Sequence, residues 1–304
     1  MTLPKWLVRT GQVVLVIAVT YGIVRALVPE LGKINAHDFA AWKPDAFGVI
    51  VSLALLLVVY LTHCMLWRHI TTRLGGVKPG LKSSLRIYFV SSLGRYIPGK
   101  LWQIAGLALL AQQAGISPVA ATAASVTAQL AFMSAGLVYL GVLMPDWGGY
   151  GPFLGLILLV GIVEILFLSR SWWRPKLGQK MSDALALIET IRWQDALKWW
   201  LVYAATWILL GVAFVLFVQS FAPLDQAQMI RVAGTVAASY LAGYVFLISM
   251  AGLGVREGVM VGLLSGAVLA PAGAIVVSVL SRLWFTAAEL LPLLLIPIMR
   301  DEKR

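Results

Sequence analysis

The sequence predicts an all-α fold, a polytopic membrane helix bundle of about seven to eight transmembrane helices with one or two broken or re-entrant segments. Of the 304 residues, 60% are hydrophobic and only 12% are charged. The mean hydropathy is +0.88, and a soluble core cannot bury so much apolar surface. Residues 1–304 therefore form a single predicted transmembrane domain.

Seven segments are apolar over a length suited to a transmembrane helix. They are residues 8–28, 46–67, 118–143, 151–169, 199–221, 232–250 and 272–299. The first follows Lys5 and Arg9, as the apolar part of a signal peptide would. It continues to Val28 without a small-residue cleavage pattern, so we expect it to be retained as the first span.

Two further apolar segments, at about 87–113 and 252–269, are interrupted by charged residues. Loop charge bears on both, because short cytoplasmic loops are rich in lysine and arginine. The loop at about 68–86 has five basic residues and no acidic one, and the loop at about 170–198 has six basic and three acidic residues. Both loops and the N-terminus are therefore predicted to be cytoplasmic. A full crossing by 87–113 would separate the two loops, so this segment is predicted to be re-entrant. For 252–269, loop charge favours a crossing, with re-entry as the alternative.

The first interruption reads GRYIPGK. Gly94 and Gly99 permit unusual backbone angles, and Pro98 disfavours helix before it. Arg95 and Lys100 would lie beside the start of the next half-helix, where free amides favour an anion such as phosphate. The alternative is that both side chains anchor the turn by reaching the cytoplasmic headgroups.

The second interruption begins AGLGVREGV. Gly252, Gly254 and Gly258 surround the adjacent pair Arg256 and Glu257. Neighbouring residues point about 100° apart on a helix, so each charge is expected to need another partner. Ionisable residues at membrane depth usually pair or face a cavity.

Candidate partners lie in the last span, where Arg282 and Glu289 are seven residues apart and share a helix face. We expect Arg282 and Glu289 to neutralise Glu257 and Arg256 respectively. Such a network would hold the bundle together or line a polar path for a lipid headgroup. Glu164 is another isolated charge, for which a structural role is expected.

The two interrupted segments resemble each other. Each has glycines, a basic residue, an apolar half-helix and then a proline, from Lys100 to Pro118 and from Arg256 to Pro271. Paired breaks of this kind are typical of transporters built from repeats, whose site lies between the repeats.

The stretches SSLGRYIPGKLWQIAG and AGLGVREGVMVGLL, with Arg282 in the last span, resemble the transmembrane region of the lysylphosphatidylglycerol synthase family of flippase-like membrane proteins. Some members of that family also carry an aminoacyl-transferase domain, and this chain is expected to be a stand-alone member. Arg95, Lys100, Arg256 and Glu257 match the family motifs. The resemblance implies a lipid-handling membrane bundle.

The sequence thus predicts a bacterial inner-membrane protein that translocates an anionic or modified lipid or glycolipid. The alternatives are a membrane-embedded headgroup or glycosyl transferase, and a scaffold for a lipid-synthesis enzyme. We find no catalytic constellation and expect no enzymatic activity. His37, His63 and His69 do not form a ligand set, so neither metal nor cofactor is expected. The expected partners are membrane lipids, with a lipid-synthesis enzyme or a second copy as further partners and no nucleic acid.

Overall fold

The computed structural model describes residues 44–75, 77–96, 101–143, 179–245 and 254–296, and these form helices and the turns between them. The elements are α3 (Ala46–Gly75), α4 (Leu81–Ser92), the 3-10 helix η1 (Leu93–Tyr96), α5 (Leu101–Gln113), α6 (Pro118–Leu143), α8 (Gln179–Glu189), α9 (Trp193–Gln219), α10 (Gln226–Val245), α11 (Val255–Leu264) and α12 (Pro271–Leu295). The predicted polytopic all-α class is confirmed.

Four of these helices, α3, α6, α9 and α12, are long and apolar enough to cross a membrane. They correspond to the predicted spans 46–67, 118–143, 199–221 and 272–299, and α6 has the predicted bounds. Helices α3 and α9 extend beyond their spans into charged sequence, since α3 continues to Gly75 and α9 begins at Trp193. The predicted spans 8–28 and 151–169 lie outside the described residues.

Contacts at the helix ends fix the directions of α3 and α9. The Asp45 amide, just before α3, donates to the Ser220 carbonyl just after α9, at 2.8 Å. At the other end, Arg73 of α3 forms an ion pair with Asp195 of α9, 3.4 Å long. These two helices are therefore antiparallel. We call the end with Arg73 the basic end and the end with Asp45 the opposite end.

Helices α6 and α12 complete the long bundle. Trp207 of α9 lies against Gly136 of α6, and Gly211 further along α9 lies against Tyr139 further along α6, so these two helices run in the same general direction. Trp284 of α12 donates to Ser52 near the start of α3. Further along both helices, Tyr60 of α3 donates to Glu289 of α12. Because the contacts advance together, α12 is parallel to α3.

The first interrupted segment forms a hairpin that starts and finishes at the basic end. Helices α4 and α5 pack against each other, and α5 is followed closely by α6, whose start lies beside Gly75. The two helices have 12 and 13 residues, about 20 Å each, whereas the hydrocarbon layer is about 30 Å thick. We call this pair the first hairpin; it has the predicted re-entrant form.

The second interrupted segment forms another hairpin, which starts at the opposite end. Helix α10 follows the end of α9, and its Tyr240 contacts Trp207 near the middle of α9. Helix α11 then packs back along α10 and leads into the start of α12. The favoured crossing of 252–269 is therefore wrong, because α11 has only 10 residues, about 15 Å of helix. Residues 232–250 were predicted as a separate span, but α10 is instead the other arm of this second hairpin.

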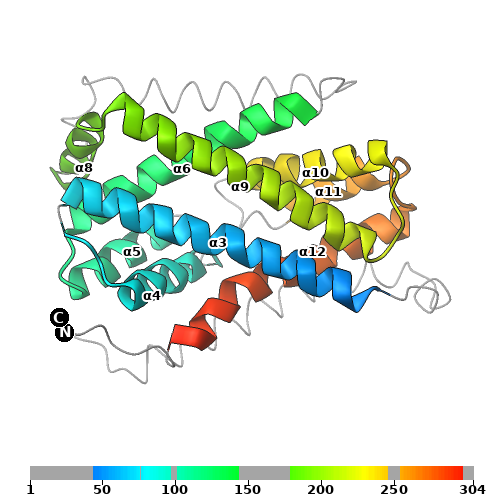
Figure 1. Ribbon diagram of the computed structural model, residues 1–304, viewed down its shortest axis with the longest axis horizontal. Helices are drawn as coiled ribbons and strands as arrows, with labels where there is room; N and C mark the ends of the chain where they lie inside the picture. The colour runs from blue at the N-terminus through cyan, green and yellow to red at the C-terminus, as the bar shows by residue number, and fades with distance from the viewer. Residues whose placement is uncertain (1–43, 76, 97–100, 144–178, 246–253, 297–304) are drawn as a thin grey trace.

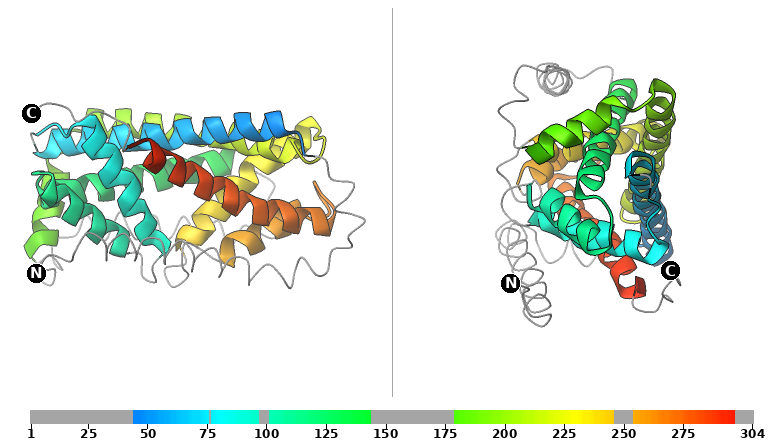
Figure 2. Two further views of the ribbon diagram at one scale, coloured as in Figure 1. Left: turned by 90° about the horizontal axis from the view of Figure 1, so that it is seen from below. Right: turned by 90° about the vertical axis from the view of Figure 1, so that its left-hand side faces the viewer.

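The two hairpins thus enter from opposite ends of the bundle. In Figures 1 and 2, α4 and α5 lie at one end of the long axis, and α10 and α11 lie toward the other. The order long helix, hairpin, long helix occurs twice, in α3 to α6 and in α9 to α12, with opposite directions. This arrangement has the topology of the inverted repeats found in transporters.

Aromatic side chains pack between α6, α9 and α10 at the centre of this bundle. Phe132 stacks on Trp207 with ring centroids 4.5 Å apart and an interplanar angle of 11°. Trp207 is fully buried, and its ring covers Gly136 of α6. Because Gly136 has no side chain, the Trp207 ring can lie directly against the backbone of α6.

Gly136→Ala is expected to destabilise the protein. A Cβ at residue 136 would lie 2.5 Å from Cζ2 of Trp207. Overpacking of this kind corresponds to a fall in melting temperature of about 2–6 °C for a chain of this size. The measurement is the thermal unfolding of purified protein in detergent. Gly141→Ala on the same helix is the control, because no atom lies within 4 Å of its Cβ position. Equal melting temperatures for the two variants would contradict this packing.

Candidate functional site

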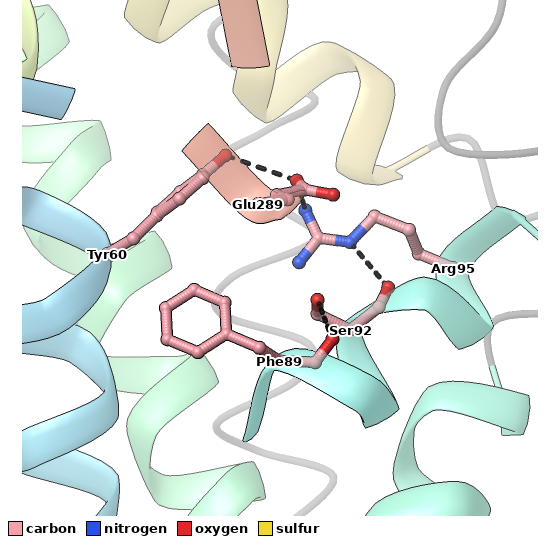
Figure 3. A network of polar contacts seen from close by, with 5 residues as sticks. All are labelled: Tyr60, Phe89, Ser92, Arg95 and Glu289. Carbon is pink, nitrogen blue, oxygen red and sulfur yellow. Dashed lines mark hydrogen bonds and ion pairs between the residues drawn. The ribbon is translucent and has the colours of Figure 1, made fainter. Parts of the chain in front are cut away.

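The tip of the first hairpin carries Arg95, which is bound in the middle of the bundle. Arg95 lies in η1 and donates from Nη1 to Oε1 of Glu289 on α12 at 2.7 Å. The same carboxylate oxygen accepts a hydrogen bond from the Tyr60 hydroxyl of α3 at 3.2 Å. Figure 3 shows these three side chains converging from three separate elements. Glu289 is only 3% exposed, so its carboxylate is held by protein groups inside the bundle.

Local structure orients the Arg95 side chain toward Glu289. Its Nε donates to the Ser92 carbonyl at 3.0 Å, at the end of α4 (Figure 3). The Ser92 hydroxyl in turn donates to the Phe89 carbonyl at 2.8 Å. Since α4 ends here, the Ser92 carbonyl can accept from a side chain rather than from a later helical amide.

The second hairpin is joined to the same helix by a second ion pair. Glu257 lies in the first turn of α11. The Nε atom of Arg282, on α12, donates to Oε1 of Glu257. The other carboxylate oxygen, Oε2, accepts from the Gly254 amide at 2.8 Å. Gly254 has a φ of +82°, a conformation that favours glycine. Glu257 therefore both caps α11 and attaches it to α12.

Arg256 is placed differently from these paired charges. Its guanidinium carbon lies 5.0 Å from the ring centroid of Tyr240 and 4.4 Å from that of Phe285. Cation–π contacts of this kind are favourable, particularly away from water. The Nη2 atom is buried and has no hydrogen-bond partner among the described residues.

The five charges occupy one region, the central charged layer, defined as Arg95, Arg256, Glu257, Arg282 and Glu289. Both hairpin tips reach it, and α12 contributes one acceptor and one donor two turns apart. The layer is level with the middle of α3, where Tyr60 lies. Two ion pairs hold two hairpins of opposite origin against a single helix.

The predicted pairing within this layer is half confirmed. Arg282 does neutralise Glu257, as expected. The expected pairing of Glu289 with Arg256 is wrong, because the first hairpin tip brings Arg95 to Glu289 instead. The alternative for Arg95 was an anchor at the cytoplasmic headgroups, but its side chain instead binds Glu289 at mid-bundle depth, because α4 carries it inward from the basic end.

The glycines of the two motifs have different roles in the structure. Gly94 does not need the unusual backbone angles predicted for it; its missing side chain instead allows the backbone of α5 to approach, since a Cβ would lie 2.9 Å from Cα of Gln103. Gly254 does have the predicted angle. Gly258 has neither a positive φ nor a close neighbour, and nothing in the structure explains it. Lys100, Pro98, Gly99, Gly252 and Glu164 lie outside the described residues.

Tyr60, Tyr240 and Phe285 belong to this site but were not expected from the sequence. Tyrosine within an apolar run reads as ordinary core packing, and only the fold shows that the Tyr60 hydroxyl faces a carboxylate. Sequence reasoning also gave no role to His63, which hydrogen-bonds Thr206 at 2.9 Å. Within the described residues, no group of three or more His, Cys, Asp or Glu suits a metal ion.

Comparison with known families gives this layer a context. The family model described as the lysylphosphatidylglycerol synthase TM region matches residues 11–289. The chain belongs to this family. The matched residues include both hairpins and every residue of the central charged layer. No curated protein and no solved structure matches the chain. The protein is thus a multi-pass helical membrane protein of the lysylphosphatidylglycerol synthase TM region family.

Proposed function

We propose that this member of the lysylphosphatidylglycerol synthase TM region family moves a lipid between membrane leaflets and passes its headgroup through the central charged layer. One observation carries the proposal: two helical hairpins, entering from opposite ends, bring charged side chains together at the middle of the bundle. Ionisable groups at membrane depth are costly and usually mark a path for ions, protons or substrates.

The physical task of such a protein is to replace water around a charged headgroup while it crosses the apolar layer. Paired arginine and glutamate side chains can exchange partners with a headgroup that brings its own charges. The first hairpin, with arms of 12 and 13 residues, does not extend through the full depth of the bundle. Inverted hairpins of this kind allow a central site to open toward one side and then the other.

The cargo in this proposal is an anionic or modified lipid or glycolipid of the bacterial inner membrane. The basic end would face the cytoplasm, in keeping with the enrichment of lysine and arginine on that side. The described helices α3, α4, α8 and α9 supply or flank most of the basic residues there, including Arg73, Lys82 and Arg86. The proposal treats the protein as a translocator without catalytic chemistry of its own.

Lipid movement in reconstituted vesicles tests this function. The probe is phosphatidylglycerol with a fluorescent acyl chain, and dithionite bleaches only the outer leaflet. We expect vesicles with the protein to lose more than the outer-leaflet fraction, whereas protein-free vesicles lose only that fraction. Bleaching limited to the outer leaflet in both would contradict the proposal.

A double variant separates transport from folding. Arg95→Gln with Glu289→Gln removes both charges of one pair without leaving either one unpaired, so the protein is expected to stay folded. Lipid movement is expected to slow by about tenfold or more, since a loss of about 1.4 kcal/mol in barrier stabilisation already gives that factor. The control, Arg73→Gln with Asp195→Asn, removes the more exposed pair at the basic end and should move lipid at the wild-type rate. Equal rates for both double variants would contradict a role for the central charged layer.

A further inference from the structure

We infer that Arg256 is the contact for a single negative charge, the phosphodiester of a lipid headgroup, at the midpoint of the path. This inference rests on the proposed function for its substrate class, and it concerns a side chain that neither ion pair of the central charged layer uses. Three independent features support it: the charge balance of the layer, the unsatisfied guanidinium atom and the shape of its aromatic surroundings.

Among the described residues, the central charged layer contains three arginines and two glutamates, so one positive charge is in excess. A buried excess charge is costly unless it is paired, and one bound monoanion would make the layer neutral.

The excess charge belongs to Arg256, because the other two arginines each bind a glutamate. The Nη2 atom of Arg256 is buried without a hydrogen-bond partner among the described residues. A guanidinium nitrogen is an obligate donor, and leaving it unsatisfied in the interior costs free energy. An anion at this atom would satisfy the hydrogen bond and the charge together.

The aromatic surroundings of Arg256 favour a bound ligand over a permanent ion pair. The Tyr240 and Phe285 rings hold the guanidinium by cation–π contacts at 5.0 and 4.4 Å. Such contacts stabilise the charge only in part, so the cation stays available for a stronger partner. Because the rings come from α10 and α12, the guanidinium lies between the second hairpin and the helix that also binds the first.

A phosphodiester is the anion that fits best. It carries one negative charge, which matches the excess of one, and its two unesterified oxygens match the planar fork of a guanidinium. A phosphomonoester carries up to two negative charges, so it would leave the layer with a net negative charge. A zwitterionic headgroup would bring an additional cation next to Arg282 and Arg95.

Calorimetric titration of the purified full-length protein in a non-ionic detergent tests this site directly. The probe is glycerophosphoglycerol, a water-soluble headgroup with one phosphodiester and no other charge. We expect saturable binding to wild type, binding at least tenfold weaker to Arg256→Gln, and binding weakened by only a few-fold in Arg256→Lys, which keeps the charge but loses the fork. Arg231→Gln is the control, because Arg231 is an exposed arginine near the start of α10, and it should bind as wild type does.

The specificity and the folding controls complete the test. Glycerophosphocholine, a zwitterion, is expected to bind at least tenfold more weakly than glycerophosphoglycerol. Arg256→Gln removes an unpaired charge together with two cation–π contacts, so its melting temperature should stay close to that of wild type. The inference is overturned if Arg256→Gln binds the probe as tightly as wild type does, or if wild type binds the zwitterion equally well. If the Arg256 inference fails but lipid still moves in vesicles, the proposed function is retained. If probe binding depends on Arg256 but no lipid moves, the proposed function is wrong and the binding site is retained.

Discussion

Glu289→Gln is expected to lower the free energy of unfolding by about 3 kcal/mol, because it removes the negative charge that the structure places against Arg95 in the bundle interior. Glu289 is 3% exposed, and the Arg95 side chain is 23% exposed. The partial exposure of Arg95 places the expected loss at the lower end of the range for buried pairs. The measurement is reversible unfolding in mixed micelles with increasing SDS, followed by circular dichroism.

The double variant Arg95→Gln with Glu289→Gln shows whether this loss comes from the pair. If an unpaired Arg95 causes the instability, the double variant should be more stable than Glu289→Gln alone by about 1 kcal/mol or more. The exposed pair of Arg73 and Asp195 serves as the comparison. Asp195→Asn should lower the free energy of unfolding by no more than about 1 kcal/mol. Losses that simply add in the double variant would mean that Arg95 and Glu289 do not interact.

Glu257→Ala is expected to release the second hairpin from α12 while the first hairpin stays in place. The substitution removes both the ion pair with Arg282 and the hydrogen bond from the Gly254 amide. A local opening that becomes easier by about 2–3 kcal/mol raises amide exchange about 30- to 150-fold. Hydrogen exchange with mass spectrometry should show this increase in peptides from Val255–Leu264, and little change in peptides from Leu81–Ser92.

Asp225→Ala is the matched control for this prediction. Asp225 accepts from the Gln228 amide at 2.8 Å and caps α10, yet no described ion pair involves it. Its loss should cost about 1 kcal/mol and change exchange only near the start of α10. If Glu257→Ala changed exchange no more than Asp225→Ala did, the ion pair with Arg282 would not hold the hairpin.

The long helices and the first break were predictable because their signals are local. Helix α6 has the predicted bounds, with a proline in its first turn. The first hairpin followed from the glycines and proline of GRYIPGK together with the charge of the flanking loops. The second hairpin was missed because segment 232–250 is apolar over the length of a span. Composition cannot distinguish a crossing helix from one arm of a buried hairpin, and only the break that follows reveals the difference.

The charged residues of the site were predictable, but their partners were only partly so. Charged residues inside apolar segments are recognisable from the sequence as candidate site residues. The seven-residue spacing places Arg282 and Glu289 on one face of α12. Which hairpin tip reaches which residue depends on depth and direction in the bundle. The sequence near Glu289 does not show that Arg95, 194 residues earlier in the chain, approaches it. The Tyr60 hydroxyl was missed for the same reason.

The opposed insertion of the two hairpins is the central claim, and cysteine labelling tests it most directly. In a Cys64→Ala background, single cysteines at Lys78 and Gln113 mark the start and the finish of the first hairpin, and cysteines at Asp225 and Ala270 mark those of the second. All four positions are exposed. With a membrane-impermeant maleimide applied to one side of oriented vesicles, we predict that positions 78 and 113 label from one side and positions 225 and 270 only from the other. Labelling of 78 and 113 from opposite sides, or of all four from the same side, would contradict the account.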